Sequence, residues 1–196
     1  MKISGEKMIK NRPLLILVSG LPCTGKTTVS NELSVHYDLP LFGRDAIKES
    51  LFDNLGWKDR EWSKKLGQAS YSLLYKIIES QLKSKKSCIV ESNFNPKFDT
   101  QIFLDFQKKY DFSVLIIHCE ADGEVLFNRF KLRSESGERH QGHRDHTNYD
   151  EFRETLLKGH LDILDISGEV VKIDTTNFSK LNLNEVYEKL DGKISE

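Results

Sequence analysis

The sequence predicts an α/β protein in which a parallel sheet is covered by helices on both faces. Two observations lead to this fold class: short, continuously apolar runs recur along the chain, and helical patterns of apolar residues lie between them. Continuous apolar runs suit strands that are buried on both faces, and strands that alternate with helices form parallel sheets. A chain of 196 residues is long enough for one domain with a complete core.

Five apolar runs are expected to be the strands, at 14–20, 39–43, 87–92, 112–119 and 169–175. The residues between them step by three and four, as one face of a helix does. The expected helical faces are Trp62, Leu66, Ala69, Leu73 and Ile77; Phe98, Ile102 and Phe106; and, before the last strand, Phe152, Leu156, Leu161 and Leu164. The segment 133–150 is polar, contains glycine and lacks periodicity, which indicates a long functional or mobile loop.

The composition is that of an ordinary globular protein, with 38% hydrophobic and 30% charged residues and a formal net charge of −1. Such a chain has no overall field to hold a polyanion, which disfavours nucleic acid as a partner but leaves room for a local basic groove. Its three cysteines are widely separated, which favours a reduced, cytoplasmic protein over a disulfide scaffold. The apolar runs are too short to span a membrane, so no membrane partner is expected.

The stretch GLPCTGKTT follows the first apolar run and matches the phosphate-binding P-loop, G-x-x-x-x-G-K-[ST]. In such a loop, successive main-chain N–H groups point at phosphate oxygens, and the following helix adds its positive end. The lysine reaches the β- and γ-phosphates, and the threonine hydroxyl binds Mg²⁺. The flanking strand and helix signals are those that the motif requires. We therefore expect a nucleotide site formed by Gly20, Leu21, Pro22, Cys23, Thr24, Gly25, Lys26, Thr27 and Thr28.

The chain lacks the signature motifs of several classes of P-loop protein. It has no N-K-x-D to read guanine and no D-G-x-P-R of nucleoside monophosphate kinases. An AAA-type motor would carry an Asp-Glu pair where CIVES supplies only Glu91. Two D-x-x-G matches, at Asp53 and Asp165, do not directly follow a strong strand. Once these classes are set aside, the P-loop is interpreted as that of a small phosphotransferase.

Asp45, in FGRDAIKESLF, comes just after the second expected strand. The carboxyl ends of parallel strands line the ligand crevice, so its carboxylate should face the P-loop and can accept the proton of an attacking hydroxyl. The alternative is that Asp45 only caps the helix that follows. Arg44 and Lys48 either bind an acidic part of the substrate or are solvated charges.

Four arginines are candidates for a lid, expected at approximately 129–148, that closes over the transferred phosphate. Arg129 and Arg133 share one helix face, and Arg139 and Arg144 follow in the polar loop. Arginines on a lid neutralise the transferred oxygens and exclude water. We expect the first two to be catalytic and the last two to contact substrate. The alternative is a charged, exposed helix end.

Three histidines in this lid, His140, His143 and His146, are three residues apart. That spacing brings only neighbouring pairs to one helix face, and no cysteine lies nearby to complete a zinc site. We interpret them as loop residues, one of which can touch substrate or nucleotide.

Glu91 ends the third expected strand, in CIVESNF. A carboxylate at that strand end can bind a metal through water or orient Thr27, so Thr27 and Glu91 are the expected Mg²⁺ site. Asn93 is a candidate hydrogen-bond partner of the substrate. The structural alternative is a turn that leads into a helix at Lys97.

The segments GLPCTGKTT, GRDAIKESLF, VESNF and RFKLRSESGERHQGHRD together resemble the zeta-toxin, polynucleotide-kinase-like and chloramphenicol phosphotransferase-like group of AAA-type, ATP-binding P-loop kinases. The resemblance covers 14–175. It implies a three-layer P-loop NTPase fold with a five-stranded parallel sheet of P-loop kinase type, and MgATP-dependent phosphorylation of a hydroxyl. At the third strand, polynucleotide kinases carry Asp-x-Thr-Asn, where this chain has ESNF.

The resemblance also implies roles for individual residues. Asp45 corresponds to the general base, Lys26 and Thr27 to the phosphate and Mg²⁺ site, and Arg129 and Arg133 to lid arginines.

The resulting hypothesis is an ATP-dependent kinase that transfers the γ-phosphate to a hydroxyl of a small molecule, with ATP and Mg²⁺ as cofactors. Two alternatives stay open: a 5′-hydroxyl polynucleotide kinase with steep salt dependence, and a nucleotide-binding regulatory protein without transfer activity. We expect a flexible leader at 1–13 and a single domain at 14–196. Acceptor specificity is expected in the helices from 46 to 83, which carry Trp57, Trp62 and Tyr71. The sequence indicates neither the acceptor nor the oligomeric state.

Overall fold

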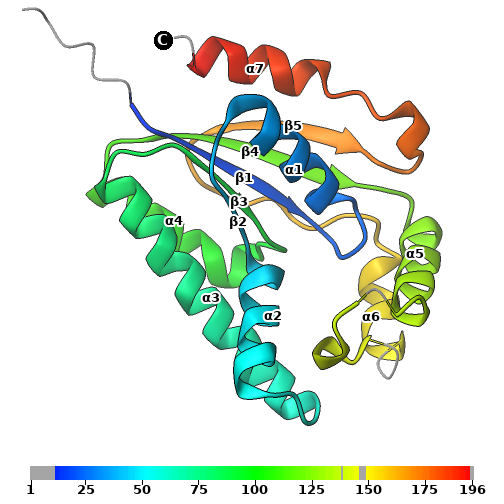
Figure 1. Ribbon diagram of the computed structural model, residues 1–196. Helices are drawn as coiled ribbons and strands as arrows, with labels where there is room; N and C mark the ends of the chain where they lie inside the picture. Colours follow the sequence, from blue (N-terminus) through cyan, green and yellow to red (C-terminus); the bar gives the residue numbers. More distant parts are fainter. Residues whose placement is uncertain (1–11, 138, 146–148, 195–196) are drawn as a thin grey trace, which may run out of the picture.

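A five-stranded parallel sheet forms the centre of the computed structural model, which describes residues 12–137, 139–145 and 149–194 (Figure 1). The order of the strands is β2-β3-β1-β4-β5, and all neighbouring strands are parallel. The strands are β1 (Leu14–Gly20), β2 (Leu41–Gly43), β3 (Cys88–Glu91), β4 (Ser113–Glu120) and β5 (Glu169–Asp174). The predicted fold class is therefore confirmed, although the second strand is shorter than the expected 39–43.

Helices cover both faces of the sheet (Figure 1). One face carries α1 (Lys26–Tyr37) and α7 (Asn184–Ile194), and the other carries α3 (Arg60–Lys83) and α4 (Pro96–Lys109). Three more helices stand at the carboxyl ends of the strands: α2 (Arg44–Leu55), α5 (Gly123–Glu135) and α6 (Tyr149–Leu156). Short 3₁₀ turns lie at Gln141–His143 and Phe178–Lys180.

The first strand is buried along its whole length, as its apolar sequence predicts. Its side chains alternate between the two faces of the sheet. Ile16 and Val18 belong to the core under α1 and α7, whereas Leu15 and Leu17 belong to the core under α3 and α4. This strand therefore fixes the position of the loop that follows it.

A third apolar cluster attaches the P-loop to the two helices beside it. Leu21 of the loop packs with Leu126 and Phe130 of α5 and with Leu156 of α6. All four side chains are almost completely buried. Because α5 carries Arg129, this packing holds one lid arginine at a fixed place relative to the loop.

The buried face of α4 agrees only in part with the expected one. Phe106 is buried as expected, but Phe98 is 65% exposed and the carboxylate of Asp99 is buried. Asp99 Oδ1 accepts a hydrogen bond from the Tyr75 hydroxyl at 2.5 Å, and its Oδ2 accepts one from the Asn95 amide at 2.6 Å. Hydrogen bonds of this kind offset the cost of burying a carboxylate. A pattern of hydrophobic residues does not reveal that such a carboxylate is buried.

The expected buried face of α3 is likewise confirmed only in part. Leu66 is buried as expected, whereas Leu73 is 44% exposed and Leu74 and Ser70 are buried. The Ser70 hydroxyl donates to the Gly67 carbonyl oxygen at 2.7 Å, so burial leaves it satisfied. A pattern of apolar residues does not reveal a buried serine of this kind.

The helix expected before the last strand is shorter than its apolar spacing suggests. It ends at Leu156, and the half-buried Leu161 and buried Leu164 lie in an irregular connection to β5. Gly159 adopts a left-handed φ of 76° there, and a β-carbon would lie 2.5 Å from the Ala121 carbonyl oxygen. A helix cannot continue through that conformation.

The loop expected at 133–150 is partly ordered into helix. The helix α5 continues to Glu135, a 3₁₀ turn follows at Gln141–His143, and α6 begins at Tyr149. His146 lies outside the described residues.

The leader expected at 1–13 lies outside the described residues except for its last two positions. Arg12 pairs with Asp111, and the Pro13 carbonyl oxygen accepts from the Ser113 amide at 2.9 Å. None of the described helices is both long and apolar enough to cross a membrane. The three cysteines are free thiols.

Candidate active site

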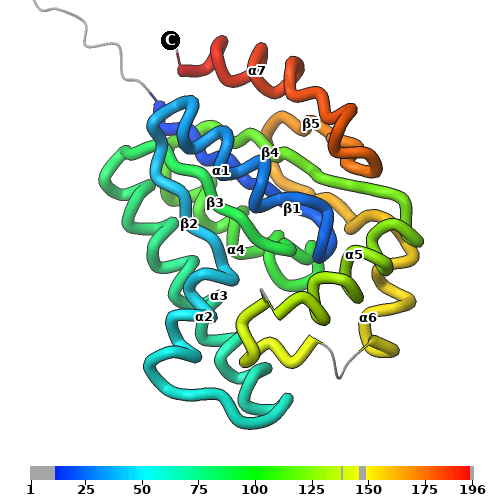
Figure 2. Tube along the Cα trace, turned by 45° about the vertical axis from the view of Figure 1, so that its right-hand side comes forward, coloured from blue at the N-terminus to red at the C-terminus, as the bar shows by residue number. Residues whose placement is uncertain are grey.

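A cavity of about 1010 Å³ opens beyond the carboxyl ends of β1, β2 and β3. Its walls come from the P-loop, from α2 and α3, and from the segment between α5 and α6. In the turned view, α2 and the α5–α6 segment stand opposite each other on the same side of the sheet (Figure 2). The crevice beyond the strand ends is where open α/β sheets bind their ligands.

Two glycines give the P-loop its path. Gly20 has a φ of 147°, and a β-carbon there would lie 2.2 Å from the Cys119 carbonyl oxygen. Gly25 has a φ of 76°, and a β-carbon there would lie 2.3 Å from the Phe178 ring. Gly25 is also the N-cap of α1, and no side chain caps that helix. The N–H groups of its first turn are therefore available to an anion.

The side chain of Lys26 is a buried cation within this loop. It is only 6% exposed, and its Nζ donates to the Leu21 carbonyl oxygen at 2.7 Å. Burial lowers the pKa of Lys26, while the nearby carboxylate of Glu91 opposes that effect. A buried ammonium group whose hydrogen-bonded partner is a neutral carbonyl favours the arrival of an anion.

Six of the expected P-loop residues line the cavity, and the others support the loop from inside. Leu21 and Thr24 are buried, and the Thr24 hydroxyl donates to the Leu21 carbonyl oxygen at 2.8 Å. The Thr175 hydroxyl, at the end of β5, donates to the Thr24 carbonyl oxygen at 2.9 Å. The lining residues are Pro22, Cys23, Gly25, Lys26, Thr27 and Thr28.

Thr27 and Glu91 meet at the edge of the loop, as the expected metal site requires. The Thr27 hydroxyl donates to Glu91 Oε2 at 3.2 Å, and Thr27 is exposed to the cavity. Burial raises the pKa of Glu91, while Lys26 opposes that shift. A hydroxyl and a carboxylate are the oxygen ligands that Mg²⁺ prefers, so the residues fit the ion. Among the described residues there is no larger cluster of His, Cys, Asp and Glu that could hold a metal.

Asp45 faces the cavity from the first turn of α2. The interpretation of Asp45 as the N-cap is wrong. Gly43 is the N-cap of α2, and the start of the helix has no capping hydrogen bond from a side chain. Asp45 Oδ1 pairs with Arg44 at 3.0 Å, and Oδ2 pairs with Arg139 at 2.7 Å. Burial raises the pKa of Asp45, but the charges of Arg44, Arg139 and His143 together outweigh it and hold the pKa well below its ordinary value.

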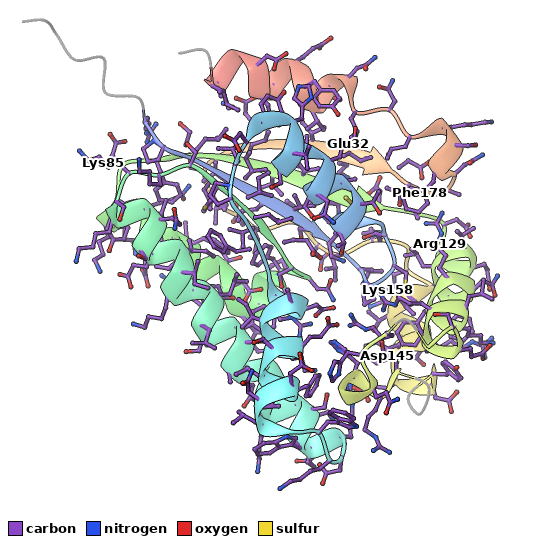
Figure 3. All side chains as sticks on the ribbon, in the orientation of Figure 1. Glu32, Lys85, Arg129, Asp145, Lys158 and Phe178 are labelled. Atoms are coloured by element: carbon purple, nitrogen blue, oxygen red, sulfur yellow. The ribbon has the colours of Figure 1, made fainter. Side chains whose placement is uncertain are left out.

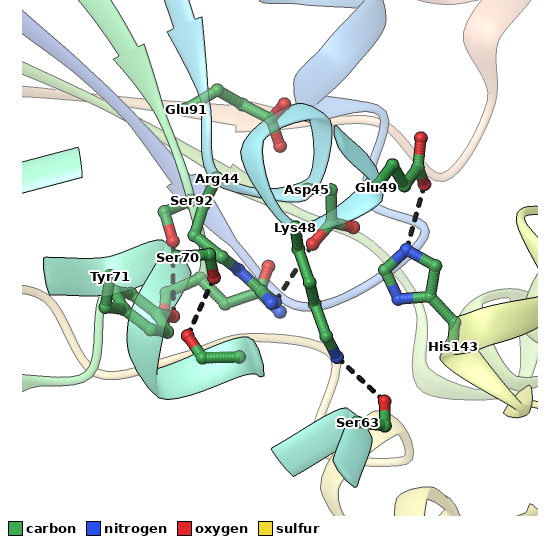
Figure 4. Close-up of polar contacts among 12 residues, drawn as sticks. Arg44, Asp45, Lys48, Glu49, Ser63, Ser70, Tyr71, Glu91, Ser92 and His143 are labelled. Carbon is green, nitrogen blue, oxygen red and sulfur yellow. Dashed lines mark hydrogen bonds and ion pairs between the residues drawn. The ribbon is translucent and has the colours of Figure 1, made fainter. Parts of the chain in front are cut away.

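Arg139 connects the lid segment to α2 through several carboxylates. Besides Asp45, it pairs with Glu49 at 3.2 Å and with Asp145 at 3.2 Å. His143 Nε2 lies 2.9 Å from the same Glu49 carboxylate, as the close-up shows (Figure 4). Reasoning from the sequence missed Glu49 and Asp145; their only signal was that both lie within segments already singled out, FGRDAIKESLF and the polar loop.

Lys48 and Arg44, the two expected substrate ligands on α2, both line the cavity. Lys48 Nζ lies 3.0 Å from the Ser63 hydroxyl of α3 (Figure 4). The guanidinium of Arg44 lies over the Tyr71 ring, 5.1 Å from its centroid. Asn93 also lines the cavity, and its carbonyl oxygen accepts from the Tyr71 hydroxyl at 3.3 Å. Tyr71 itself lies behind the lining and orients these groups.

The first two lid arginines take different positions. Arg129 donates to the carbonyl oxygens of Thr175 and Thr176, at 2.9 and 3.0 Å, and stacks on Phe178 at 4.5 Å (Figure 3). Its Nη1 is buried without a hydrogen-bond partner among the described residues. Phe178, which reasoning from the sequence missed, also lines the cavity and covers Gly25. The only sequence signal for Phe178 was its place just after the last strand.

Arg133 shares a carboxylate partner with Arg139, whereas Arg129 does not. Its Nη2 lies 3.6 Å from the Asp145 carboxylate, which also pairs with Arg139. Arg133 lines the cavity, whereas Arg144 does not and donates to the Lys58 carbonyl oxygen at 2.7 Å. The structure therefore brings together three of the four expected lid arginines.

The two lid histidines within the described residues, His140 and His143, both pack against Phe52 but have different polar partners. His143 lines the cavity, whereas His140 stacks on Phe52 and lies 3.1 Å from Asp53. Trp57 and Trp62, which were expected near the acceptor, do not line the cavity. Trp57 is instead packed edge-on against His140.

The chain matches the AAA domain family AAA_33 over residues 15–156. No curated protein matches it. Among solved structures, a candidate kinase from Chloroflexus aurantiacus J-10-fl is 36% identical, with a TM-score of 0.84; the match covers 93% of this chain and 98% of that one. A sugar kinase from Janibacter sp. HTCC2649 is 14% identical, with a TM-score of 0.53 and coverage of 94% and 95%, and shares the fold. The chain belongs to the AAA_33 domain family and has its P-loop kinase-like fold.

Proposed function

We propose that this protein is an ATP-dependent phosphotransferase that transfers the γ-phosphate to a hydroxyl of a small molecule. The observation that carries the proposal is the juxtaposition in one cavity of an uncapped helix start, the buried Lys26 and, across from them, the carboxylate of Asp45. The first two suit a triphosphate and the third suits a hydroxyl. The family and the fold are consistent with this activity.

The P-loop is the proposed site of the triphosphate. Its free first-turn amides and the Lys26 ammonium group would hold phosphate oxygens, and the ammonium group would then exchange a neutral carbonyl partner for an anion. Thr27 and Glu91 would hold Mg²⁺, which when bound neutralises charge on the β- and γ-phosphates. Phe178 and Arg129 flank the loop at Gly25 and offer flat surfaces to a nucleoside.

Asp45 is the proposed partner of the acceptor hydroxyl. Its lowered pKa keeps it ionised at neutral pH, so it accepts a hydrogen bond well but is a weak base. Phosphoryl transfer through a loose transition state asks mainly for positioning of the attacking oxygen, so a weak base suffices. Arg139 now occupies one oxygen of that carboxylate, at 2.7 Å. We propose that Arg139, with Arg133, turns to the transferred phosphate when the ligands bind.

The experiment is an ADP-release assay with MgATP over a panel of nucleosides, aminoglycosides, sugars, sugar acids, amino alcohols and 5′-hydroxyl oligonucleotides. Lys26→Ala serves as the blank. With the best acceptor, Asp45→Asn should lower kcat by about 10²-fold or more while MgATP affinity, measured by calorimetry, changes little. Unchanged turnover in Asp45→Asn would remove Asp45 from the mechanism.

The same assay separates the two other candidate functions. A polynucleotide kinase would transfer only to oligonucleotides, with affinity that falls steeply with salt. A regulatory nucleotide-binding protein would be stabilised by MgATP without releasing ADP with any acceptor. Either result would replace the proposed activity.

A further inference from the structure

Lys48 is a buried cation whose hydrogen-bond partner is a neutral hydroxyl. Its side chain projects from α2 toward α3, and the residue is 6% exposed. Nζ has the neutral Ser63 hydroxyl as its hydrogen-bond partner, at 3.0 Å, and lies 5.2 Å from the centroid of the Phe52 ring. Among the described residues no carboxylate forms an ion pair with it. Buried charges in proteins are normally paired, so an anionic ligand that paired with this ammonium group would be stabilised.

Arg44, one helical turn earlier, is a second cation with a donor group that lacks a partner among the described residues. Its Nη2 pairs with Asp45 at 3.0 Å, but its Nε is buried without a hydrogen-bond partner among the described residues. Arg44 and Lys48 are four residues apart on one helix, a spacing at which like charges destabilise the helix. Burial lowers the pKa of Lys48 to about 8, and Arg44 adds to that effect. The pair thus carries an energetic cost that an anionic ligand would remove.

The carboxylates near Lys48 form their ion pairs with other cations. Asp45 is paired with Arg44 and Arg139, and Glu49 is paired with Arg139 and His143. The charge of Asp45 favours the protonated form of Lys48, but burial and the neighbouring cations outweigh that effect. The cavity lining from α3 adds two further cations, Lys64 and Arg60, of which Arg60 pairs with Glu151 at 2.6 Å.

We infer that the acceptor carries an anionic group, a carboxylate or a phosphate, that binds between α2 and α3 at Lys48, Ser63 and Arg44. This inference rests on the proposed phosphotransferase function and gives its substrate class: a small hydroxylated organic anion. Its anionic group accepts from Lys48 Nζ and from Arg44 Nε, and its hydroxyl reaches Asp45. That hydroxyl oxygen forms the new bond to the γ-phosphorus, the bond from phosphorus to the β–γ bridging oxygen breaks, and ADP leaves. The hydroxyl proton passes to Asp45 and then to solvent.

The test compares pairs of polyhydroxy compounds in which only one member carries an anionic group. The probes are D-gluconate with D-sorbitol, D-glycerate with glycerol, and glucose 6-phosphate with glucose, each titrated calorimetrically into the protein saturated with MgADP. We expect at least one anion to bind about tenfold or more tightly than its neutral counterpart, as loss of a buried charged hydrogen bond predicts. Preference for the first two pairs identifies a carboxylate, and preference for the third identifies a phosphate.

Variants locate the binding group. Lys48→Met should lower the affinity for that anion about tenfold or more and leave MgATP affinity unchanged, whereas Lys48→Arg should retain most of it. Lys65→Met removes one charge from an exposed position of α3 outside the cavity lining and should leave both affinities unchanged. In turnover, Lys48→Met should raise the acceptor KM more than it lowers kcat.

The outcomes separate this inference from the proposed function. Equal binding of anionic and neutral probes, failure of every anion to bind, or an undiminished anion affinity in Lys48→Met overturns the inference. If an anion binds at Lys48 but no acceptor leads to ADP release, the anion site is supported and the phosphotransferase function is rejected. If ADP is released as readily with a neutral acceptor as with its anionic counterpart, the phosphotransferase function stands and the anion site is rejected.

Discussion

Arg139 Nη2 donates to Asp45 Oδ2 across 2.7 Å, which ties the segment between α5 and α6 to the first turn of α2. The two residues are 94 positions apart in the sequence. The contact places a lid cation on the carboxylate that we propose for the acceptor hydroxyl. In the absence of ligands, the protein therefore satisfies both charges internally.

Replacing Arg139 with methionine should destabilise the protein by about 1–2 kcal/mol at pH 7, because a half-buried, charged hydrogen bond is lost. A carboxylate whose pKa is lowered by folding contributes stability above its unfolded pKa and loses that contribution as pH falls through its folded pKa. The difference between wild type and Arg139→Met should accordingly shrink below pH ~4. Urea unfolding at several pH values measures it.

The control for this prediction is an ion pair on the surface. Lys108 lies 3.1 Å from Asp105, and both side chains are largely exposed. Lys108→Met should change the stability less than Arg139→Met does, because solvent screens such a pair. An equal loss in both variants would contradict a special role for the Arg139 contact.

The affinity for an anionic acceptor should fall above pH 8. The pKa of Lys48 is lowered to about 8, so the free protein loses this charge as pH rises, whereas a bound anion favours the protonated form. Affinity should drop by up to about tenfold per pH unit above that value, with a proton taken up on binding. Lys48→Arg should give a flat profile in calorimetric titrations at pH 7–10. The charged groups around Lys48 are Arg44 and Asp45 of α2, Arg60 of α3, and Arg139 and His143 of the lid segment.

A flat profile in the wild-type protein would contradict this assignment of the titrating group. A falling profile that persists in Lys48→Arg would show that a different group is responsible.

Gly25→Ala should weaken both folding and MgATP binding. A left-handed φ costs an alanine about 1–2 kcal/mol, and the new methyl group would also meet the Phe178 ring. Adding Phe178→Ala removes the clash but not the backbone strain, so thermal stability should recover only in part. The double variant should also lack the aromatic surface proposed for the nucleoside.

Gly137→Ala is the matched control for that variant. Gly137 has the same φ of 76°, but nothing lies within 4 Å of its β-carbon position. It should show the backbone cost alone, about 2–4 °C in Tm per kcal/mol for a domain of this size. An equal loss of stability in the two glycine variants would mean that the Phe178 contact is unimportant.

Tyr75→Phe should destabilise the protein by about 1–3 kcal/mol, because it leaves one oxygen of the buried Asp99 carboxylate without its donor. Combining it with Asp99→Asn should give a loss smaller than the sum, since both variants remove the same interaction. Tyr110→Phe, which loses a hydrogen bond to the half-buried Glu79 carboxylate, should have a smaller effect, because that carboxylate keeps Lys109 as a partner. Denaturant unfolding of the wild type and the four variants measures these effects, and strict additivity would contradict the coupling.

The sequence was informative where structure follows from neighbouring residues. The boundaries of β1, the P-loop and the start of α2 are local patterns, so the positions of Lys26 and Asp45 at one edge of the sheet could be predicted. The buried faces of α3 and α4 could be predicted only in part. Their burial includes Ser70 and Asp99, which are made tolerable by partners such as Tyr75 that periodicity does not reveal.

The contacts of the lid could not be predicted either. The sequence indicated that the lid arginines belong near the phosphates, but which carboxylate each one meets depends on chain folding over long separations. Arg139 pairs with Asp45 and Glu49, whereas Arg144, only five positions later, turns to a main-chain oxygen. The spacing of charges along the lid carries no information on that choice.

The pair of helices α2 and α3 joins the rest of the protein through the three-residue edge strand β2 at one end and β3 at the other. Lys48, Ser63 and Arg44 all belong to this hairpin, and no residue of the P-loop does. The phosphate-binding loop and the proposed acceptor site, Asp45 included, thus belong to separate segments of the chain. A graft of another hairpin between Gly43 and Cys88 that keeps Asp45 in place is consequently a direct route to changing the proposed acceptor without altering the P-loop.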